Sequence, residues 1–171
     1  MGDIRVTFTA TRRKKRLQGK ALVDNGAQTS MLGLNDACRL GLDIARAKKV
    51  DRETAGGLLL SGLRLRGVHV EANGRTAKLD DVFVPIAQEI IVGGREVSRP
   101  VGREQEPLLG QDFLQASNSF LDFENDTLLG IETLGPPISL SRKERVRPAS
   151  KEHRELIRAL ATCPVPKRKR R

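Results

Sequence analysis

The sequence has little of the aromatic and apolar material from which most cores and all membrane helices are built. Its 171 residues include no Trp, no Tyr and only five Phe, so a core must consist mainly of Leu, Val and Ile. No apolar run approaches the roughly 18 residues that a membrane-spanning helix needs, so we expect no membrane partner. With so few aromatic rings, any contact with nucleic acid would depend on phosphate charge rather than on base stacking.

Cysteine is equally scarce. Cys38 and Cys163 are the only two, lie far apart and match no metal or redox spacing. They favour a reducing compartment, with Cys38 as a small buried apolar group. Neither histidine has a cysteine or carboxylate at metal-ligand spacing, and no glycine-rich nucleotide motif or nucleophile elbow is present. We therefore expect neither a metal nor a cofactor.

Positive charge is abundant but unevenly placed. The net charge is +10, yet residues 1–140 hold 19 Lys+Arg and 18 Asp+Glu, whereas residues 141–171 hold 12 Lys+Arg and 3 Glu. The patch Lys167–Arg171 is typical of a nuclear-localisation or polyanion-binding segment, and equally of a solvated charge run. A smaller cluster, Arg12–Arg16, lies between two strand-like runs and predicts an exposed hairpin loop. We expect an intracellular protein, cytoplasmic or nuclear.

Hydrophobic alternation predicts a mostly-β body with one or two short helices. Asn73–Gly74 is a strong hairpin signal because both residues tolerate positive φ. The predicted strands are 4–9, 21–23, 63–71, 76–84, 120–123 and 127–131, and the predicted short helices are 34–40 and 112–117.

Two prolines after Gly135 end this pattern and predict a domain over residues 1–135, followed by a basic tail over residues 136–171. Within the tail, residues 150–162 could form a short helix with Ser150 as its N-cap. An isolated helix of about 13 residues is marginal in water, so we expect the tail to be loosely ordered unless it docks.

Asp24 stands in the most informative segment, Leu-Val-Asp-Asn-Gly-Ala-Gln-Thr-Ser at 22–30. An apolar strand runs into a carboxylate, and a glycine turn follows. A second segment at 107–114, Pro-Leu-Leu-Gly-Gln-Asp-Phe-Leu, contains an apolar pair, a glycine and the start of a helix. Taken alone, Asn25–Gly26 also fits a two-residue hairpin turn. It is the order of the parts around it that favours a carboxylate held in a cleft.

Over residues 3–133 the chain resembles the retropepsin-like aspartic peptidases, the single-lobe family that includes retroviral proteases. The resemblance implies a small closed β-barrel with Asp24 as the catalytic residue on an active-site loop of Asn25, Gly26 and Ala27. Leu108, Leu109 and Gly110 would pack beneath that loop as its support, although simple core packing is compatible with the same residues. It implies a homodimer, because residue 24 is the only aspartate with a glycine two places on and the chemistry needs two carboxylates that share a proton.

The glycine-rich segment 54–62, with Ala55, Gly56 and Gly57 at its centre, is the candidate substrate flap, and Val68–Thr76 competes with it. One departure stands out, since the family has Thr or Ser where this chain has Asn25. In the family, the hydroxyl of this Thr or Ser makes a hydrogen bond across the dimer axis. The side-chain amide of Asn25 also has a donor and an acceptor but is larger. Asp112 we expect to cap or start a helix rather than to take part in chemistry.

The sequence therefore predicts a homodimeric aspartic endopeptidase that acts on a peptide or protein substrate. The alternative is a catalytically weak or inactive dimer of the same fold that acts as a binding module. In that case residues 141–171 would contact nucleic acid or another polyanion.

Overall fold

The computed structural model describes residues 3–54, 56–130 and 147–164. Its first hairpin joins β1 (Ile4–Arg12) to β2 (Lys15–Val23) through a turn in which Arg13 has a φ of 55°. Along β1 the residues alternate between the core and the surface, as the sequence pattern predicts. The basic cluster at 12–16 accordingly lies at a hairpin end, as predicted.

The remaining elements follow the predicted order, with a longer strand and three further strands. The elements are α1 (Leu34–Arg39), β3 (Lys49–Glu53), β4 (Leu59–Ala72), β5 (Arg75–Val92), β6 (Arg95–Pro100), β7 (Leu108–Leu109), α2 (Gln111–Ala116), β8 (Ser119–Asp122), β9 (Thr127–Gly130) and α3 (Lys151–Leu160). Asn73 and Gly74 form the predicted turn with φ values of 48° and 72°. The strand after this turn is extended, and a further strand, β6, pairs with it through Gly93 and Gly94. The other two unpredicted strands are β3 and β7.

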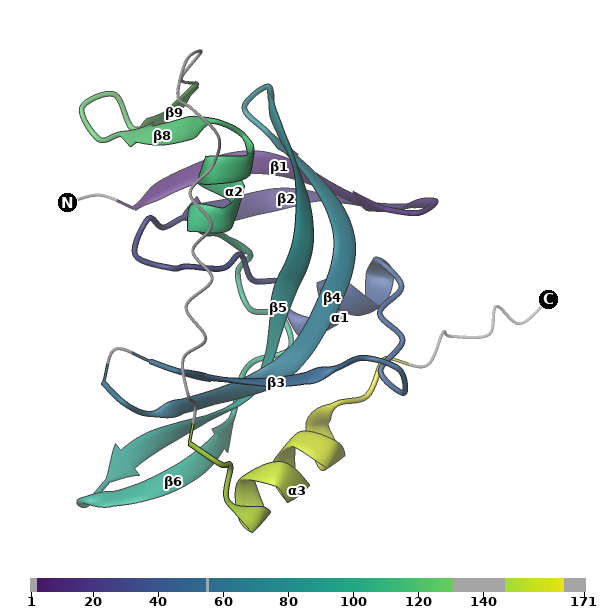
Figure 1. Cartoon of the computed structure of the whole chain (residues 1–171), viewed down its shortest axis with the longest axis vertical. Helices are drawn as coiled ribbons and strands as arrows, with labels where there is room; N and C mark the ends of the chain where they lie inside the picture. Colours follow the sequence, from purple (N-terminus) through teal and green to yellow (C-terminus); the bar gives the residue numbers. More distant parts are fainter. Residues whose placement is uncertain (1–2, 55, 131–146, 165–171) are drawn as a thin grey trace.

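One sheet organises most of these strands. Its order is β6-β5-β4-β1-β2-β7, with β3 added on β4, while β8 and β9 form a separate pair. The long strands β4 and β5 curve along the molecule and connect its two ends (Figure 1). One end holds β1, β2, α2 and the β8–β9 pair, and the other holds β3, β6 and α3.

The fold is mostly β, as predicted, but the described residues form no closed barrel. Met31 lies between β7 and β5, where it makes single bridges to Leu108 and to Phe83. Closure of the sheet would need a continuous strand between β7 and β5. Within the described chain, only the single bridges of Met31 join them, so the sheet stays open there.

The core is aliphatic, as the lack of aromatic residues predicts. Phe8 and Phe113 are its largest fully buried side chains, and Leu, Val, Ile and Ala residues from β1, β2, β4, β5 and both α1 and α2 surround them.

The cysteine prediction was wrong. Cys38 in α1 and Cys163, just after α3, form a disulfide with their Cα atoms 5.7 Å apart. The pairing was hidden because 125 residues separate the two cysteines. It becomes possible only when the C-terminal helix docks on the body. Cys38 is therefore no free buried thiol, and the argument for a reducing compartment loses its basis.

The predicted C-terminal helix is present and docked. The Ser150 side chain accepts a hydrogen bond from the His153 amide at 3.1 Å, so Ser150 is the N-cap that the sequence predicts. Ile157 is buried, and α3 packs against β5 and β6. The predicted domain boundary at residue 135 and the patch Lys167–Arg171 lie outside the described residues. Within the described ranges, no helix has the length and apolar character needed to cross a bilayer.

Candidate functional site

Asp24 follows β2 directly and begins a short loop that its own side chain organises. Its Oδ1 atom accepts a hydrogen bond from the Gly26 amide at 2.8 Å, and its carbonyl oxygen accepts one from the Ala27 amide at 3.3 Å. Neither Asn25 nor Gly26 adopts a positive φ, in contrast to Asn73–Gly74. The two-residue hairpin alternative is therefore excluded. Asp24 is half-buried, and its Oδ2 atom accepts no hydrogen bond from the described part of the chain.

The predicted support residues lie directly against this loop. The last residues of β2 pair in parallel with β7, so that Leu22 is opposite Leu108 and Val23 is opposite Leu109. The Asp24 amide then donates to the Leu109 carbonyl at 3.0 Å. The carboxylate is thus carried on the end of a strand that is hydrogen-bonded to a buried neighbour.

Gly110 packs so closely against the loop that no side chain fits. A Cβ atom at this position would lie 2.6 Å from the Ala27 carbonyl oxygen and 2.9 Å from the Thr29 carbonyl carbon. Its φ is −96°, so the need for glycine here comes from space and not from backbone strain. The Gly110 amide also donates to the Ser30 hydroxyl at 3.0 Å.

A polar network that sequence reasoning missed anchors the far end of the loop. Asp112 Oδ1 accepts hydrogen bonds from the Ser30 amide at 2.9 Å, from the Ser30 hydroxyl at 2.6 Å and from the Phe113 amide at 2.8 Å. Gly110 is the N-cap of α2, and Asp112 lies in the first turn. The helix thus begins at Gln111, one residue before the predicted start, and the Asp112 carboxylate holds Ser30 rather than capping the helix. Burial raises the pKa of Asp112, and the bonds from Ser30 and Phe113 oppose this shift.

Gln111, the first residue of α2, connects the helix to the Asp24 loop through two hydrogen bonds. Its side-chain Nε2 donates to the Asn25 carbonyl at 2.6 Å, and its amide donates to the Ala27 carbonyl at 2.8 Å. The side chain of Asn25 is exposed and makes no hydrogen bond within the described chain. The loop is therefore fixed through its backbone, and the Asn25 amide group remains available at the surface.

The described candidate flap residues, Gly56 and Gly57, lie at the tip of the β3–β4 hairpin. Thr54 pairs with Leu58 across the tip (2.8 Å), and Gly57, with a φ of 75°, supplies the left-handed turn between them. Gly56 and Gly57 are exposed, and Ala55 lies outside the described residues. Arg52, in β3, donates to the Thr29 hydroxyl at 2.8 Å. This contact places the end of β3 that lies next to the hairpin tip beside the loop of Asp24.

The competing flap segment, Val68–Thr76, lies at the other end of β4. Its turn residue Asn73 donates to the Leu128 carbonyl at 3.1 Å, which docks this turn on β9. No hydrogen bond or ion pair joins this segment to the Asp24 loop within the described residues.

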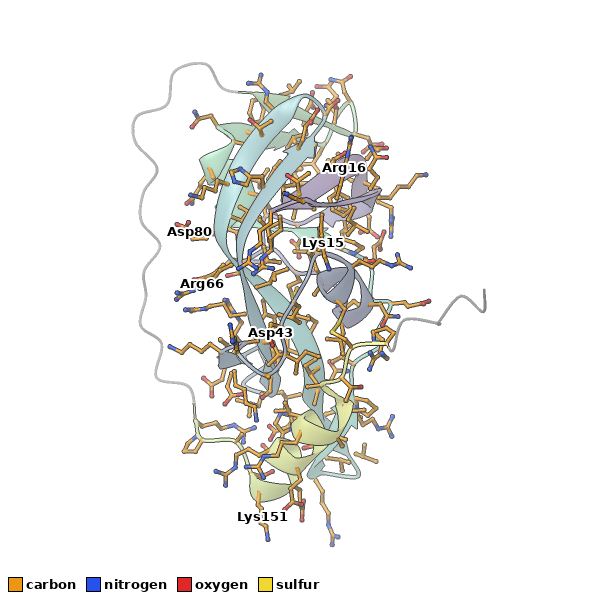
Figure 2. All side chains as sticks on the ribbon, turned by 90° about the vertical axis from the view of Figure 1, so that its right-hand side faces the viewer. Lys15, Arg16, Asp43, Arg66, Asp80 and Lys151 are labelled. Carbon is orange, nitrogen blue, oxygen red and sulfur yellow. A yellow bond between two sulfur atoms is a disulfide. The ribbon has the colours of Figure 1, made fainter. Side chains whose placement is uncertain are left out.

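The basic cluster contains one structural residue and four exposed ones. Arg12 donates to the carbonyls of Gly41 and Arg66, each at 2.8 Å, and burial lowers its pKa, with a smaller contribution from Arg13. The exposed members are Arg13, Lys14, Lys15 and Arg16. Figure 2 shows Arg16 in the upper half of the molecule and Lys151 at its lower end, so these two cationic side chains lie far apart. In the described ranges no group of three His, Cys, Asp or Glu residues could hold a metal ion.

A family model described as aspartyl protease matches residues 10–113. The matched range starts in β1 and ends in α2, so it includes the Asp24 loop, the β3–β4 hairpin and β7. A search of curated proteins found no match.

Proposed function

The chain belongs to the aspartyl protease family, as its resemblance to the retropepsin-like peptidases predicted, and from this premise we propose that it is a homodimeric endopeptidase. Asp24 from each of two subunits would share a proton and activate a water molecule for attack on a peptide carbonyl. One observation carries the proposal. The Asp24 carboxylate is held by the Gly26 amide, on a loop that β7 and α2 fix in place, while its second oxygen is unengaged within the described chain.

The chemistry requires two carboxyl groups in different states. One accepts a proton from water, and the other donates a proton toward the carbonyl oxygen of the substrate. Two carboxyl groups about 3 Å apart cannot both ionise, so the pair titrates with two separate apparent pKa values. No ion pair or hydrogen bond joins Asp24 to a second carboxyl group in the described chain. A second copy, related by a two-fold axis, would supply the missing group.

The first test is cleavage of a mixed peptide library by the purified chain between about pH 3 and pH 8. Asp24→Asn should abolish cleavage, because a neutral amide can neither share nor accept the proton. Asp80→Asn is the matched control, since it makes the same change at an exposed carboxylate on β5 (Figure 2) and should leave activity unchanged. Should Asp24→Asn retain full activity, the role assigned to this carboxylate is wrong.

Mixing subunits tests the shared site. When Asp24→Asn subunits are added in equal amount to a fixed quantity of wild-type chain, random pairing converts half of the wild-type subunits into mixed dimers. Activity should then fall to about half, because a mixed dimer holds only one ionisable group on the axis. An unchanged activity would show that each chain works alone.

Asn25→Thr tests the departure from the family pattern. If two Asn25 side chains crowd the dimer axis, the smaller Thr should strengthen dimerisation and raise activity, measured by sedimentation and by peptide cleavage. A protein that cleaves nothing, together with an equally inert Asn25→Thr variant, would overturn the proposal of an active peptidase.

A second function rests on the exposed cations Arg13, Lys14, Lys15 and Arg16. Four adjacent positive side chains at a hairpin end attract phosphate groups, so we also propose weak, salt-dependent contact with a polyanion. The C-terminal residues predicted for this role, Lys167–Arg171, would add to the same attraction.

A further inference from the structure

Residues 147–163 form a segment, here called the C-terminal strap, that lies outside the range matched by the family model. The strap enters at Arg147, continues through α3 and ends at Cys163. Helix α3 lies along the end of the molecule that holds β3 and β6 (Figure 1). Its buried residues are Ile157 and a histidine, His153.

His153 is fully buried and reaches the base of the candidate flap. Its Nε2 atom lies 2.8 Å from the Ser61 hydroxyl in β4, and its Nδ1 atom lies 2.8 Å from the Ser98 hydroxyl in β6. The Ser61 hydroxyl donates a hydrogen bond to Asp51, its cross-strand partner in the β3–β4 hairpin. Because a hydroxyl has only one proton, the Ser61 oxygen accepts from His153 Nε2–H. One strap residue thus contacts the flap hairpin through a continuous polar chain.

Arg147 makes the second contact through Glu89. Glu89 is only 5% exposed. Its Oε2 atom accepts a hydrogen bond from the Leu59 amide at 3.2 Å and forms an ion pair with Arg147. Leu59 is the first residue of β4 after the flap tip. Without Arg147 the buried charge on Glu89 would lose its opposite charge, which is strongly unfavourable.

The other end of the strap is held by Arg103, between β6 and β7, and by a disulfide to α1. Arg103 donates to the carbonyls of Leu160 and Thr162, and Cys163 is joined to Cys38. Cys163 is exposed, so a soluble dithiol can reach the disulfide. These two cysteines are the only ones in the chain, and no other disulfide would be broken by the same reagent.

We propose that the C-terminal strap is a redox-released clamp on the base of the β3–β4 hairpin, and that His153 and Arg147 are its positioning residues. A thiolate of a dithiol reductant attacks one sulfur of the Cys38–Cys163 bond and displaces the other as a thiolate. The second thiol of the reductant then resolves the mixed disulfide. Two electrons pass to the protein, Cys38 and Cys163 end as thiols, and the reductant ends as a disulfide.

Release of the strap would loosen Ser61, Asp51 and Leu59 together, and with them the hairpin tip. A looser hairpin tip would change substrate entry only if the hairpin acts as a flap. That part of the inference rests on the proposed function, because the hairpin is a flap only if the chain is a peptidase. The clamp itself does not depend on that function.

Hydrogen exchange of the full chain, followed by mass spectrometry, tests the clamp directly. In the oxidised protein, residues 49–62 should be protected; reduction with dithiothreitol should lower that protection by roughly tenfold, as expected when two buried polar contacts are lost. The β8–β9 hairpin lies at the opposite end of the molecule from α3 (Figure 1) and should exchange at the same rate in both states. A double Cys38→Ser, Cys163→Ser variant should match the reduced protein whether or not dithiothreitol is present.

Two results would overturn the clamp. One is unchanged exchange at residues 49–62 after thiol alkylation has shown that the disulfide is broken. The other is alkylation of both thiols in protein kept under air, which would show that the bond does not form.

Strap variants separate a positioning role from general stability. In the oxidised protein His153→Ala should expose residues 49–62 to exchange, and His153→Gln, which keeps a donor and an acceptor, should restore part of the protection. Arg154→Ala, at the exposed neighbouring position of α3, is the control and should have no effect. Equal effects of the His153 and Arg154 variants would refute the assignment.

Peptide cleavage by the same samples distinguishes the two proposals. If reduction changes exchange but no peptide is cleaved, the clamp stands and the peptidase proposal fails. If peptides are cleaved with the same KM and kcat in both redox states and exchange is unchanged, the clamp fails and the peptidase proposal stands.

Discussion

Replacing Gly110 by Ala should displace the Asp24 loop without changing any charge or hydrogen-bonding group. The added Cβ would lie 2.6 Å from the Ala27 carbonyl oxygen, 2.9 Å from the Thr29 carbonyl carbon and 3.1 Å from the Ser30 amide nitrogen. Non-bonded atoms prefer a separation of roughly 3.5 Å, so the loop would have to move by somewhat less than 1 Å. All three neighbours are backbone atoms, and no side-chain rotation can relieve the contact.

The cost in stability follows from overpacking. Inserting a methyl group into a tightly packed site costs about 1–3 kcal/mol. In a domain of this size each kcal/mol lowers Tm by about 2–4 °C, which gives a decrease of about 2–12 °C for Gly110→Ala. If the chain is a peptidase, a displacement near 1 Å of its catalytic carboxylate should also lower kcat/KM by roughly 100-fold, measured well below the Tm.

Gly102→Ala is the matched control for this experiment. No atom lies within 4 Å of the Cβ position at Gly102, and its φ is not positive. The control should therefore unfold at the temperature of the wild type or slightly above it. If thermal unfolding and peptide cleavage give the same values for Gly110→Ala and Gly102→Ala, the close contact beneath the loop does not position Asp24.

Two further predictions concern Asp112 and the C-terminus. Burial raises the pKa of Asp112, so its contribution to stability is fully present below its unfolded value near 3.9 and is lost as the pH rises through the folded value. Asp112→Asn keeps an acceptor for Ser30 but does not titrate. The free energy of unfolding in urea should therefore fall for the wild type relative to this variant as the pH rises to neutrality. A difference that does not change with pH would contradict this. Ending the chain at Pro164 removes five of 31 Lys and Arg residues but keeps the strap, and should weaken retention on heparin and make its salt dependence shallower. Retention of the shortened chain at an unchanged salt concentration would assign binding to Arg13–Arg16 instead.

The two Asn-Gly dipeptides show how far local sequence determines structure here. Asn73–Gly74 lies between two long alternating runs, and both residues adopt positive φ in a hairpin turn. Asn25–Gly26 has the same letters but follows a strand that pairs in parallel with β7, more than 80 residues further along the chain. Local preference was decisive at the first site. At the second, long-range pairing and the Asp24–Gly26 hydrogen bond decided the conformation.

The strap shows what the sequence could not reveal. The short helix after Ser150 was predictable from its cap and its apolar face. The burial of His153 was not, because its partners Ser61 and Ser98 belong to strands far away in the chain. The β6 strand did have a local signal, since the Gly93–Gly94 pair follows the apolar run at 90–92, and such a pair after a strand-like run predicts a hairpin.

The arrangement of carboxylates bears on why one chain should be insufficient. Asp112 is the carboxyl group bonded to the Asp24 loop, but three hydrogen bonds to its Oδ1 atom commit it to Ser30 and Phe113. Asp51, in the neighbouring hairpin, accepts a hydrogen bond from the Ser61 hydroxyl. Both carboxylates stabilise local structure, and neither forms a hydrogen bond with the Asp24 carboxyl group. Under the proposed mechanism, the second carboxylate would therefore come from outside the described chain, and a second copy of the same loop would supply it by two-fold symmetry.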